Sequence, residues 1–181
     1  FTENDTICLG DQIQLFATAT GGSENYSFSW NADPAGFQSE EQNPLVAPST
    51  NTTYFCVVND GVNQKVDSME VYVNPPPIIS AGPDTIICTN QSYLVSDASA
   101  EDFVSLGWET SGDGTFNNPE ILTPVYAPGD DDIAAGMVSL TLVAQALSGC
   151  NEQADTMELM IDPCTGLDPL ISTKQTISIF P

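Results

Sequence analysis

The second half of the chain repeats the first half, and this internal duplication limits the fold more than any other feature of the sequence. Residues 67–75 read DSMEVYVNP, and residues 155–163 read DTMELMIDP. The opening DTIC of residues 5–8 returns as DTIIC at residues 84–88. A self-similar segment of this length predicts two copies of one structural unit.

Three consecutive prolines, at positions 75–77, separate the two copies. Proline fixes φ and withholds a backbone donor, so such a run favours a stiff, extended connection. We therefore predict one domain over residues 1–75 and a second, longer one over 76–163. Residues 164–181 are expected to form a linker and C-terminal segment.

Apolar and polar residues alternate along several segments of both copies. Ile13, Leu15, Ala17 and Ala19 alternate with Gln14, Thr18 and Thr20, and Tyr26, Phe28 and Trp30 alternate with small polar residues. Period-two alternation is typical of half-buried strands, and no segment shows a helical period. The predicted fold class is all-β, with two tandem antiparallel β-sandwiches. The insertion at residues 128–136 is expected to form one helical turn.

Aromatic residues give two alternative interpretations. Trp30 and Trp108 lie on equivalent central strands, so we expect them in the cores, although an exposed Trp could stack on sugars. Phe37 and Phe116 fall in turn-rich stretches and are the weaker candidates for a sugar-binding platform.

The charge balance excludes several functions. There are 25 acidic residues against two basic ones and no His, a net charge of −23, which repels nucleic acid and anionic lipid. No apolar run is long enough to span a bilayer. Because His and Arg are absent, the usual acyl- and phosphoryl-transfer sites cannot be assembled. We predict that the chain is not an enzyme; paired carboxylates of the glycosidase type are the remaining alternative.

The chain has five cysteines, without a Cys-x-x-Cys pair or the His of common zinc sites. Structural disulfides and an oxidising, extracytoplasmic compartment are therefore expected. The order Cys, Trp, Cys in each copy resembles immunoglobulin domains, and Tyr54 precedes Cys56 by two residues, as in a tyrosine corner. We expect Cys8 to pair with Cys56, and Cys88 with Cys150; the sequence leaves crossed pairings open. Cys164 would then pair with another chain or stay a thiol.

An acidic loop gives the main cofactor hypothesis. Asp113 lies between two glycines, and three consecutive aspartates follow at Asp130, Asp131 and Asp132. Carboxylates on flexible segments suit calcium, which prefers several oxygen ligands. The alternative is a solvated acidic turn in which Asp132 caps a short helix. No cofactor is expected to be required.

Several motifs resemble the PKD-like and immunoglobulin-like repeats of proteins secreted by Bacteroidetes. They are AGPDTIIC at residues 81–88, W108 with TSGDGTF at 110–116, PVYAPG at 124–129 and DIAAG at 132–136. The end of the chain, with CTGL at 164–167 and ISIFP at 177–181, is similar to the start of a type IX secretion sorting domain. The resemblance implies export across the outer membrane and display at, or release from, the cell surface. Because residue 1 is Phe, we expect a mature fragment without its targeting segment.

Four tripeptides with Asp, then Ser or Thr, then a bulky apolar residue are similar to the O-glycosylation acceptor pattern of Bacteroidetes. This implies sugars on Thr6, Ser68, Thr85 and Thr156. The alternative is that the tripeptides recur because the two copies begin and end their strands alike.

The predicted function is a non-catalytic extracellular spacer or adhesion module whose partners are neighbouring domains, surface proteins or glycans. One alternative is a carbohydrate-binding module, with or without calcium. The other is a structural subunit of a surface filament, in which the alternating segment from Thr176 to Phe180 pairs with the next copy.

Overall fold

The computed structural model describes residues 4–22 and 25–164. Strands dominate these residues, which confirms the predicted all-β class. Contacts divide the chain into two compact units. The first runs through Ile79 and includes residues 100–106 and 143–154; the second comprises residues 80–99, 107–142 and the chain from Asp155 on. No helix in the part of the chain that the structure describes is long and apolar enough to cross a membrane.

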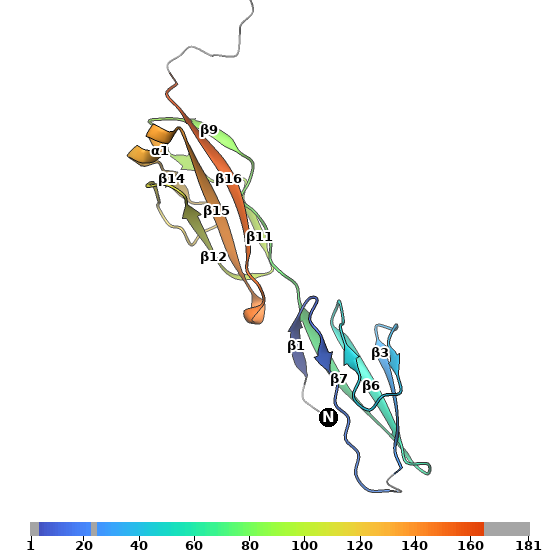
Figure 1. Ribbon diagram of the computed structural model, residues 1–181. Coiled ribbons are helices and arrows are strands. Elements are labelled where there is room, and N and C mark those ends of the chain that lie inside the picture. Colours follow the sequence, from blue (N-terminus) through green and yellow to red (C-terminus); the bar gives the residue numbers. More distant parts are fainter. Residues whose placement is uncertain (1–3, 23–24, 165–181) are drawn as a thin grey trace, which may run out of the picture. The chain divides into compact units, whose positions relative to one another are not determined.

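The first half of the chain builds a five-stranded sheet around its aromatic strands (Figure 1). Its strands follow the order β1 (Asp5–Cys8), β7 (Gln64–Asn74), β6 (Thr52–Asn59), β3 (Ser27–Asp33) and β4 (Gln38–Ser39). All neighbours are antiparallel except β1, which runs parallel to β7. A tight turn after Asn59 joins β6 to β7, with the N–H of Asp60 donating to the carbonyl of Asn63 at 3.2 Å.

A second, very small sheet completes this half. It consists of β2 (Ile13–Gln14) and β5 (Leu45–Val46). Residues of both sheets form one core, in which Trp30 is 1% exposed. The other buried members are Leu15, Ala17, Val46, Tyr54, Cys56, Met69 and Val71.

The segment predicted as one long strand from Ile13 to Thr20 is a strand only at its first two residues. Its burial still alternates, since Leu15 and Ala17 are buried while Phe16 is half exposed. At Ala17 the amide side chains of Asn43 and Gln42 replace strand partners, bonding to its N–H at 3.0 Å and its carbonyl at 2.7 Å. Beyond that residue the alternation has no strand to pair with among the residues described.

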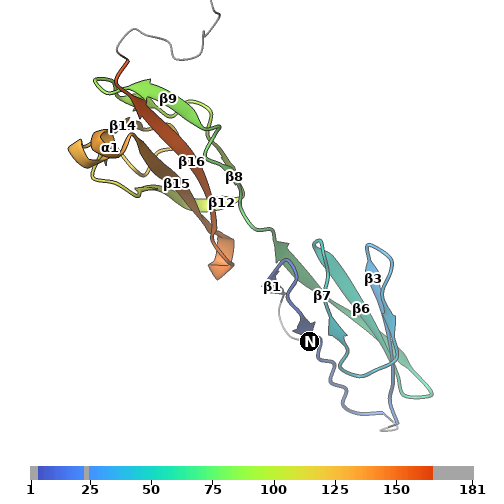
Figure 2. The same ribbon diagram turned by 45° about the horizontal axis from the view of Figure 1, so that its top comes forward.

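The second half contains a four-stranded sheet and two smaller ones (Figure 2). The large sheet has the order β12 (Phe103–Thr110), β15 (Met137–Ala146), β16 (Gln153–Asp162) and β9 (Thr85–Cys88). The small sheets are β10 (Tyr93–Leu94), β14 (Val125–Ala127) and β13 (Thr115–Phe116), and β11 (Ser99–Glu101) with β8 (Ile78–Ser80).

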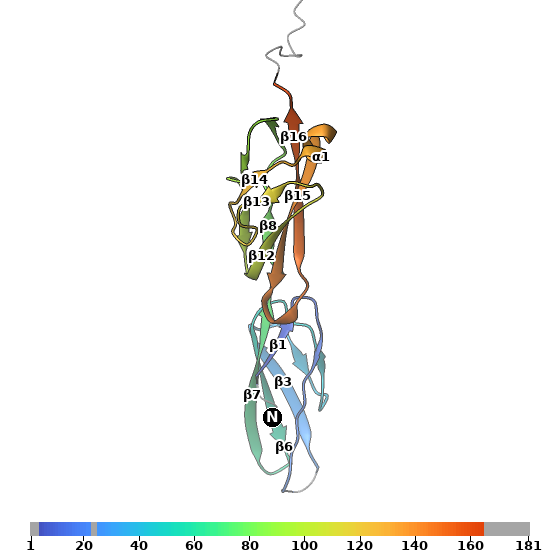
Figure 3. The same cartoon turned by 90° about the vertical axis from the view of Figure 1, so that its left-hand side faces the viewer.

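Two short helices interrupt this half. Helix α1 (Asp130–Ala135) precedes β15 and confirms the predicted helical turn (Figure 3), and the 3₁₀ helix η1 (Leu147–Gly149) joins β15 to β16. Every second residue of β15 is buried, as expected for a strand with one face in the core. With Trp108 at 4% exposure, the buried side chains include Val95, Tyr126, Leu140, Leu142, Met157 and Leu159.

The duplication predicted from the sequence is visible in the hydrogen bonds. In both halves the strand that ends at a cysteine runs parallel to the closing strand, β1 beside β7 and β9 beside β16, so that Cys8 lies opposite Asn74 and Cys88 opposite Asp162. The next N–H donates to the carbonyl of that partner, at 2.9 Å from Leu9 and 3.0 Å from Thr89. The domain bounds 1–75, 76–163 and 164–181 stay a prediction, because each contact unit combines several segments.

Candidate functional site

The acidic loop of the second half forms a compact hydrogen-bonded cluster. Asp132, in α1, is only 2% exposed. Its Oδ2 accepts three hydrogen bonds: from the Tyr126 hydroxyl at 2.6 Å and from the N–H groups of Gly114 at 3.0 Å and Gly129 at 3.1 Å. Its Oδ1 accepts the N–H of Asp113 at 3.3 Å. A carboxylate has about four lone-pair sites, and four donors bond to this one, three of them at Oδ2.

The carboxylate of Asp113 in turn accepts hydrogen bonds from backbone N–H groups of α1. Its Oδ1 accepts the N–H of Asp132 at 3.2 Å, and its Oδ2 accepts that of Asp131 at 3.3 Å. These are first-turn amides of α1, which have no partner inside the helix. Asp113 therefore caps α1 from another segment, while Asp132 bonds back to the N-cap Gly129. The alternative interpretation expected this capping by Asp132, but it expected a solvated turn, whereas Asp132 is buried.

The four predicted calcium ligands do not come together as one set. Asp130 and Asp131 are exposed on α1, whereas Asp113 and Asp132 meet through backbone N–H groups. Across the described ranges, no three His, Cys, Asp or Glu side chains gather where they could hold a metal ion. The cluster as built holds the loop in place.

Tyr126 is the residue of this cluster that the sequence did not single out as a site. Its hydroxyl also lies 2.8 Å from that of Thr110. Burial, and then the hydrogen bond to Asp132, raises the pKa of Tyr126 to about 12. The hydroxyl thus stays protonated and donates to the buried carboxylate. Its position inside PVYAPG, directly before the aspartates, was the only sequence signal.

Glycines allow this close packing. A Cβ on Gly114 would lie 2.3 Å from the Tyr126 hydroxyl oxygen, and one on Gly129 would lie 2.1 Å from Oδ1 of Asp113. Both distances are too short for any side chain. The glycines around Asp113 and before Asp130 therefore allow the two loops to approach each other closely.

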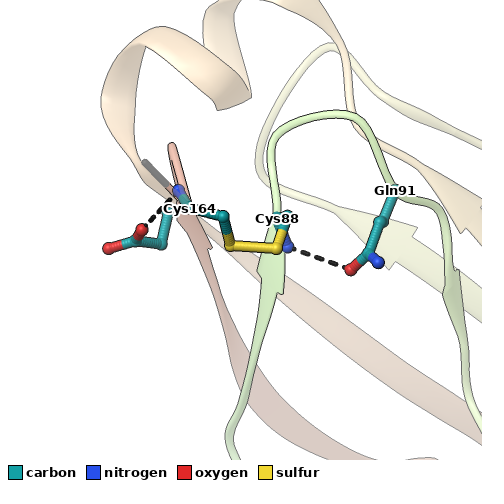
Figure 4. The surroundings of a disulfide bond; sticks show 4 residues. Cys88, Gln91 and Cys164 are labelled. Atoms are coloured by element: carbon teal, nitrogen blue, oxygen red, sulfur yellow. Dashed lines mark hydrogen bonds between the residues drawn. A yellow bond between two sulfur atoms is a disulfide. The ribbon is translucent and has the colours of Figure 1, made fainter. Parts of the chain in front are cut away.

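The disulfides differ from the expected pairs. Cys8 is bonded to Cys150, with 5.6 Å between their Cα atoms, and Cys88 to Cys164, with 5.4 Å. Figure 4 shows the second bond, with the N–H of Cys88 donating to Oε1 of Gln91. Cys56 is a buried free thiol. The expected pairs Cys8–Cys56 and Cys88–Cys150 are therefore wrong, and so is the expectation that Cys164 lacks a partner in this chain.

The strand register explains the difference. Cys8 lies opposite Asn74 on β7, whereas Cys56 lies opposite Asp67 on the same strand. Seven residues of strand span about 23 Å, and a disulfide requires Cα atoms within about 7 Å. In the second half, Cys88 lies opposite Asp162 and thus beside Cys164. Cys150 comes before the other end of β16, out of reach of Cys88.

The aromatic residues proposed as sugar platforms are packed. Trp30 and Trp108 are both buried, which confirms them as core residues. Phe37 contacts Tyr54 edge-on with ring centroids 5.4 Å apart. Phe116 lies between Trp108 at 5.9 Å and Tyr126 at 4.9 Å. Both Phe side chains are partly buried, and each packs against a buried aromatic residue.

The four expected glycosylation residues lie on strands. Thr6, Ser68 and Thr156 are exposed, and Thr85 is half-buried. The opening tripeptides are not equivalent: Oδ1 of Asp84 accepts the N–H of Glu158, and in the first half Oδ1 of Asn4 accepts that of Glu70. Asp84 thus corresponds to Asn4 and not to Asp5. Duplication therefore does not explain why the tripeptides of Thr6 and Thr85 are alike. It does explain those of Ser68 and Thr156, which lie at equivalent positions of the two closing strands.

Comparisons with known proteins identify the fold class only. No family model matches the chain, and no curated protein does. Solved structures of tandem immunoglobulin domains do match: a mutated three-domain fragment of titin has a TM-score of 0.57 and 15% identity, covering 87% of this chain and 62% of that chain. An I-band fragment of titin has a TM-score of 0.55 and 16% identity, covering 88% and 62%.

The insect immune protein hemolin also matches, with a TM-score of 0.52 and 11% identity, covering 89% of this chain and 45% of that chain. The chain thus spans less than two thirds of these structures. At identities this low, the structural similarity shows a shared fold alone. The chain consists of tandem immunoglobulin-like β-sandwiches.

Proposed function

We propose that the chain is a non-catalytic spacer or adhesion segment of a secreted or cell-surface protein. The disulfide Cys8–Cys150 is the observation that carries the proposal. Two disulfides suit an oxidising, extracellular compartment. Asp132, the most buried carboxylate among residues 4–22 and 25–164, accepts hydrogen bonds that hold a loop, and the Trp side chains fill cores. Tandem immunoglobulin-like modules with these properties are suited to holding neighbouring domains apart.

A mechanical argument supports the spacer role. Cys8 and Cys150 are 142 residues apart, so tension applied at the two ends passes through their bond and bypasses everything between them. At about 3.4 Å per extended residue, the bond withholds about 480 Å of contour length. In the chain-entropy model it also adds about 5 kcal/mol to stability by restricting the unfolded chain. Such a segment keeps its length under load.

Force spectroscopy of the whole chain, held at its two ends, tests this function. The oxidised protein should extend by about 480 Å less than the reduced protein. The pairing Cys8–Cys56 with Cys88–Cys150 would withhold only about 370 Å. The matched control is Cys88→Ser with Cys164→Ser, which leaves the long bypass intact. Equal extension of the oxidised and reduced protein would contradict the spacer proposal.

Export by a type IX secretion system is the finer part of the proposal, and it rests on the resemblance of the C-terminal segment. Apart from Cys164, residues 164–181 lie outside the described residues. Expression of the full parent gene with and without a functional secretion system tests it. Retention of the protein inside cells that lack the system would support export by this route, and unchanged release would contradict it.

O-glycosylation of Thr6, Ser68, Thr85 and Thr156 stays a proposal. A glycan needs an accessible hydroxyl, so the exposed Thr6 and Ser68 are better acceptors than the half-buried Thr85. Intact-mass analysis of native material, followed by Thr6→Ala and Thr85→Ala, tests it. A mass equal to that of the bare chain would exclude modification.

The two alternative functions keep their own tests. Carbohydrate binding, with or without calcium at the acidic loop, predicts glycan-array binding and heat in a calcium titration. Its support is weaker because Trp30 and Trp108 are buried in the cores and Phe116 packs against Trp108. A filament subunit predicts concentration-dependent polymers that deletion of residues 176–180 abolishes; those residues lie outside the described part of the chain.

A further inference from the structure

The two copies differ in the stretch that follows the Ala-Pro pair at residues 47–48 and 127–128. Strand pairing marks its end: Asp33 lies opposite Thr53, and Ser111, equally far after its Trp, donates its N–H to the carbonyl of Ser139. The stretch is residues 49–52 in the first copy and 129–138 in the second, which is six residues longer. Helix α1 has six residues and belongs to the second half (Figure 1), and in the described part of the first copy no helix replaces it.

A pocket of about 450 Å³ lies at the corresponding place in the first copy. In the second copy, Asp132 of α1 accepts hydrogen bonds from Asp113, Gly114, Tyr126 and Gly129. Positions can be matched from the shared Ala-Pro pair and from the next aromatic residue after each Trp, which is Phe37 or Phe116. The counterparts of the four donors are then Pro34, Ala35, Val46 and Ser49, and all four line the pocket. The pocket therefore corresponds to the place of the Asp132 side chain.

Two residue differences agree with this correspondence. A Cβ on Gly114 would lie 2.3 Å from the Tyr126 hydroxyl oxygen, so the second copy requires a glycine there. In the first copy Val46 replaces Tyr126 and has no hydroxyl, and Ala35 replaces Gly114. The first copy thus keeps the walls of this place without the carboxylate that fills it in the second.

The pocket is also lined by Tyr54, whose side chain is only 3% exposed. Among the residues that the structure describes, no group forms a hydrogen bond with its hydroxyl. A tyrosine corner would bond this hydroxyl to nearby backbone, and buried tyrosine hydroxyls usually have a partner. The register that matches Thr53 with Ser139 matches Tyr54 with Leu140, which has no polar group. The Tyr54 hydroxyl is therefore a donor that only this pocket contains.

Two backbone N–H groups accompany this hydroxyl. Those of Ala35 and Ser49 correspond to the N–H groups of Gly114 and Gly129, which donate to Asp132 at 3.0 and 3.1 Å. In residues 4–22 and 25–164, neither Ala35 nor Ser49 donates its N–H to an acceptor. Burial raises the pKa of Tyr54, so its hydroxyl is protonated and can donate as well. These donors suit an acceptor with several lone pairs, such as a carboxylate.

The walls of the pocket are uncharged, although the chain contains 25 acidic residues. Phe37, Leu45 and Pro48 contribute apolar surface. The volume is within the range of sites for small molecules. The net charge of −23 opposes the entry of an anion, but salt at physiological strength screens exposed charges beyond about 8 Å. Asp132 itself is a buried carboxylate held by N–H and O–H donors without a basic side chain.

We propose that this pocket, the Tyr54 pocket, binds a small carboxylic acid that has an apolar body. The carboxylate accepts hydrogen bonds from the Tyr54 hydroxyl and from the N–H groups of Ala35 and Ser49, as Asp132 does from its own donors. The apolar body contacts Phe37 and Leu45. Binding is non-covalent, and the proposal does not depend on the spacer function.

An NMR titration of the whole chain with benzoate in 0.15 M salt tests the proposal. The N–H signals of Ala35 and Ser49 should shift saturably, with a Kd of about 1 mM or below. Those of Gly114 and Gly129 are the internal control and should not move, because Asp132 already occupies them. Benzamide has a similar shape without the charge and should bind at least about fivefold more weakly. Unmoved signals at Ala35 and Ser49, or equal binding of benzamide, would overturn the proposal.

Replacing Tyr54 with Phe removes the donor and keeps the ring. Because the hydroxyl has no partner in the described chain, the urea midpoint without ligand should stay the same or rise. The Kd for benzoate should rise at least about tenfold, whereas Tyr72→Phe, outside the pocket, should change it less than about twofold. A lower urea midpoint for Tyr54→Phe would show that the hydroxyl is bonded within the protein, and the proposal would then be wrong.

A change of charge at the pocket tests the sign of the ligand, and it does so even if Tyr54→Phe does not fold. Leu45 lines the pocket and is 54% exposed, so its surface position accepts Lys or Asp. Leu45→Lys should tighten benzoate binding and Leu45→Asp should weaken it, each by about threefold, with little effect on benzamide. The same substitutions at Val62, which is 84% exposed and outside the pocket, are the control. Changes of equal direction in the two Leu45 variants would contradict a carboxylate ligand.

Discussion

The hydroxyl of Tyr126 donates a 2.6 Å hydrogen bond to Oδ2 of Asp132, and both residues are buried. A buried carboxylate that loses a donor bears the full cost of its desolvation. This pair therefore fixes the inserted helix α1 to β14. It also makes the loop sensitive to a single-atom change.

Replacing Tyr126 with Phe should lower the free energy of unfolding by about 1.5–3 kcal/mol, the range for a hydrogen bond to a charged group. Urea unfolding measures the effect. Tyr72→Phe is the matched control: its hydroxyl donates to Glu70 at 2.7 Å on the surface, so its loss should cost less than about 0.5 kcal/mol. Equal effects of the two substitutions would contradict the role of the buried pair.

Alkaline pH should remove the same contribution. The folded pKa of Tyr126, about 12, lies above the value of about 10 for an unfolded tyrosine. Its stabilisation is therefore complete below pH 10 and is lost as the pH rises through 12. The difference in unfolding free energy between wild type and Tyr126→Phe should shrink over this window. Burial also raises the pKa of Tyr54 and Tyr93, but both proteins contain them. A constant difference would argue against this pKa.

Cys56 should be the one cysteine that thiol reagents find without reduction. It is 0% exposed, and burial raises the pKa of its thiol, so it should react slowly in the native protein and rapidly in denaturant. Peptide mapping of the labelled, unreduced chain identifies the residue. Label on Cys164 instead would support the pairs expected from the sequence and contradict those of the structure.

Gly114→Ala should destabilise the second sandwich by about 1–3 kcal/mol, because its Cβ would lie 2.6 Å from the carbonyl oxygen of Ala127 as well as against Tyr126. Gly107→Ala is the control. It lies in β12 with no atom near the added Cβ, and should be neutral or stabilise by up to about 1 kcal/mol. Thermal unfolding distinguishes the two outcomes, and similar effects would refute the close contact at Gly114.

Patterns within short stretches predicted the secondary structure well. The alternating segments 67–73 and 155–161 lie in strands β7 and β16, and the Pro-Gly-Asp insertion contains helix α1. Local propensity and period are enough for such elements. The strand expected to Thr20 failed because a strand needs a neighbour, and residues 18–20 have none among those described.

The candidate site could be predicted only in part. The motif around Asp113 and the aspartates of α1 were found in the sequence, but these side chains do not assemble into a set of metal ligands. Two loops bring Asp113 and Asp132 together through N–H donors, and backbone donors leave no signature in composition. The role of Tyr126 depends on the same contact.

The sequence by itself determined that this protein consists of two copies of one β-sandwich with Trp cores, because apolar and polar residues alternate along the strands of both copies. Only the tertiary structure decided which cysteines pair. The entropy of closing a loop changes slowly with the number of residues in it, so the spacing of the cysteines along the chain does not favour one pairing over another. Position along β7 and β16 placed Cys8 away from Cys56 and Cys88 beside Cys164. A covalent bond requires proximity in space, and that follows from strand register.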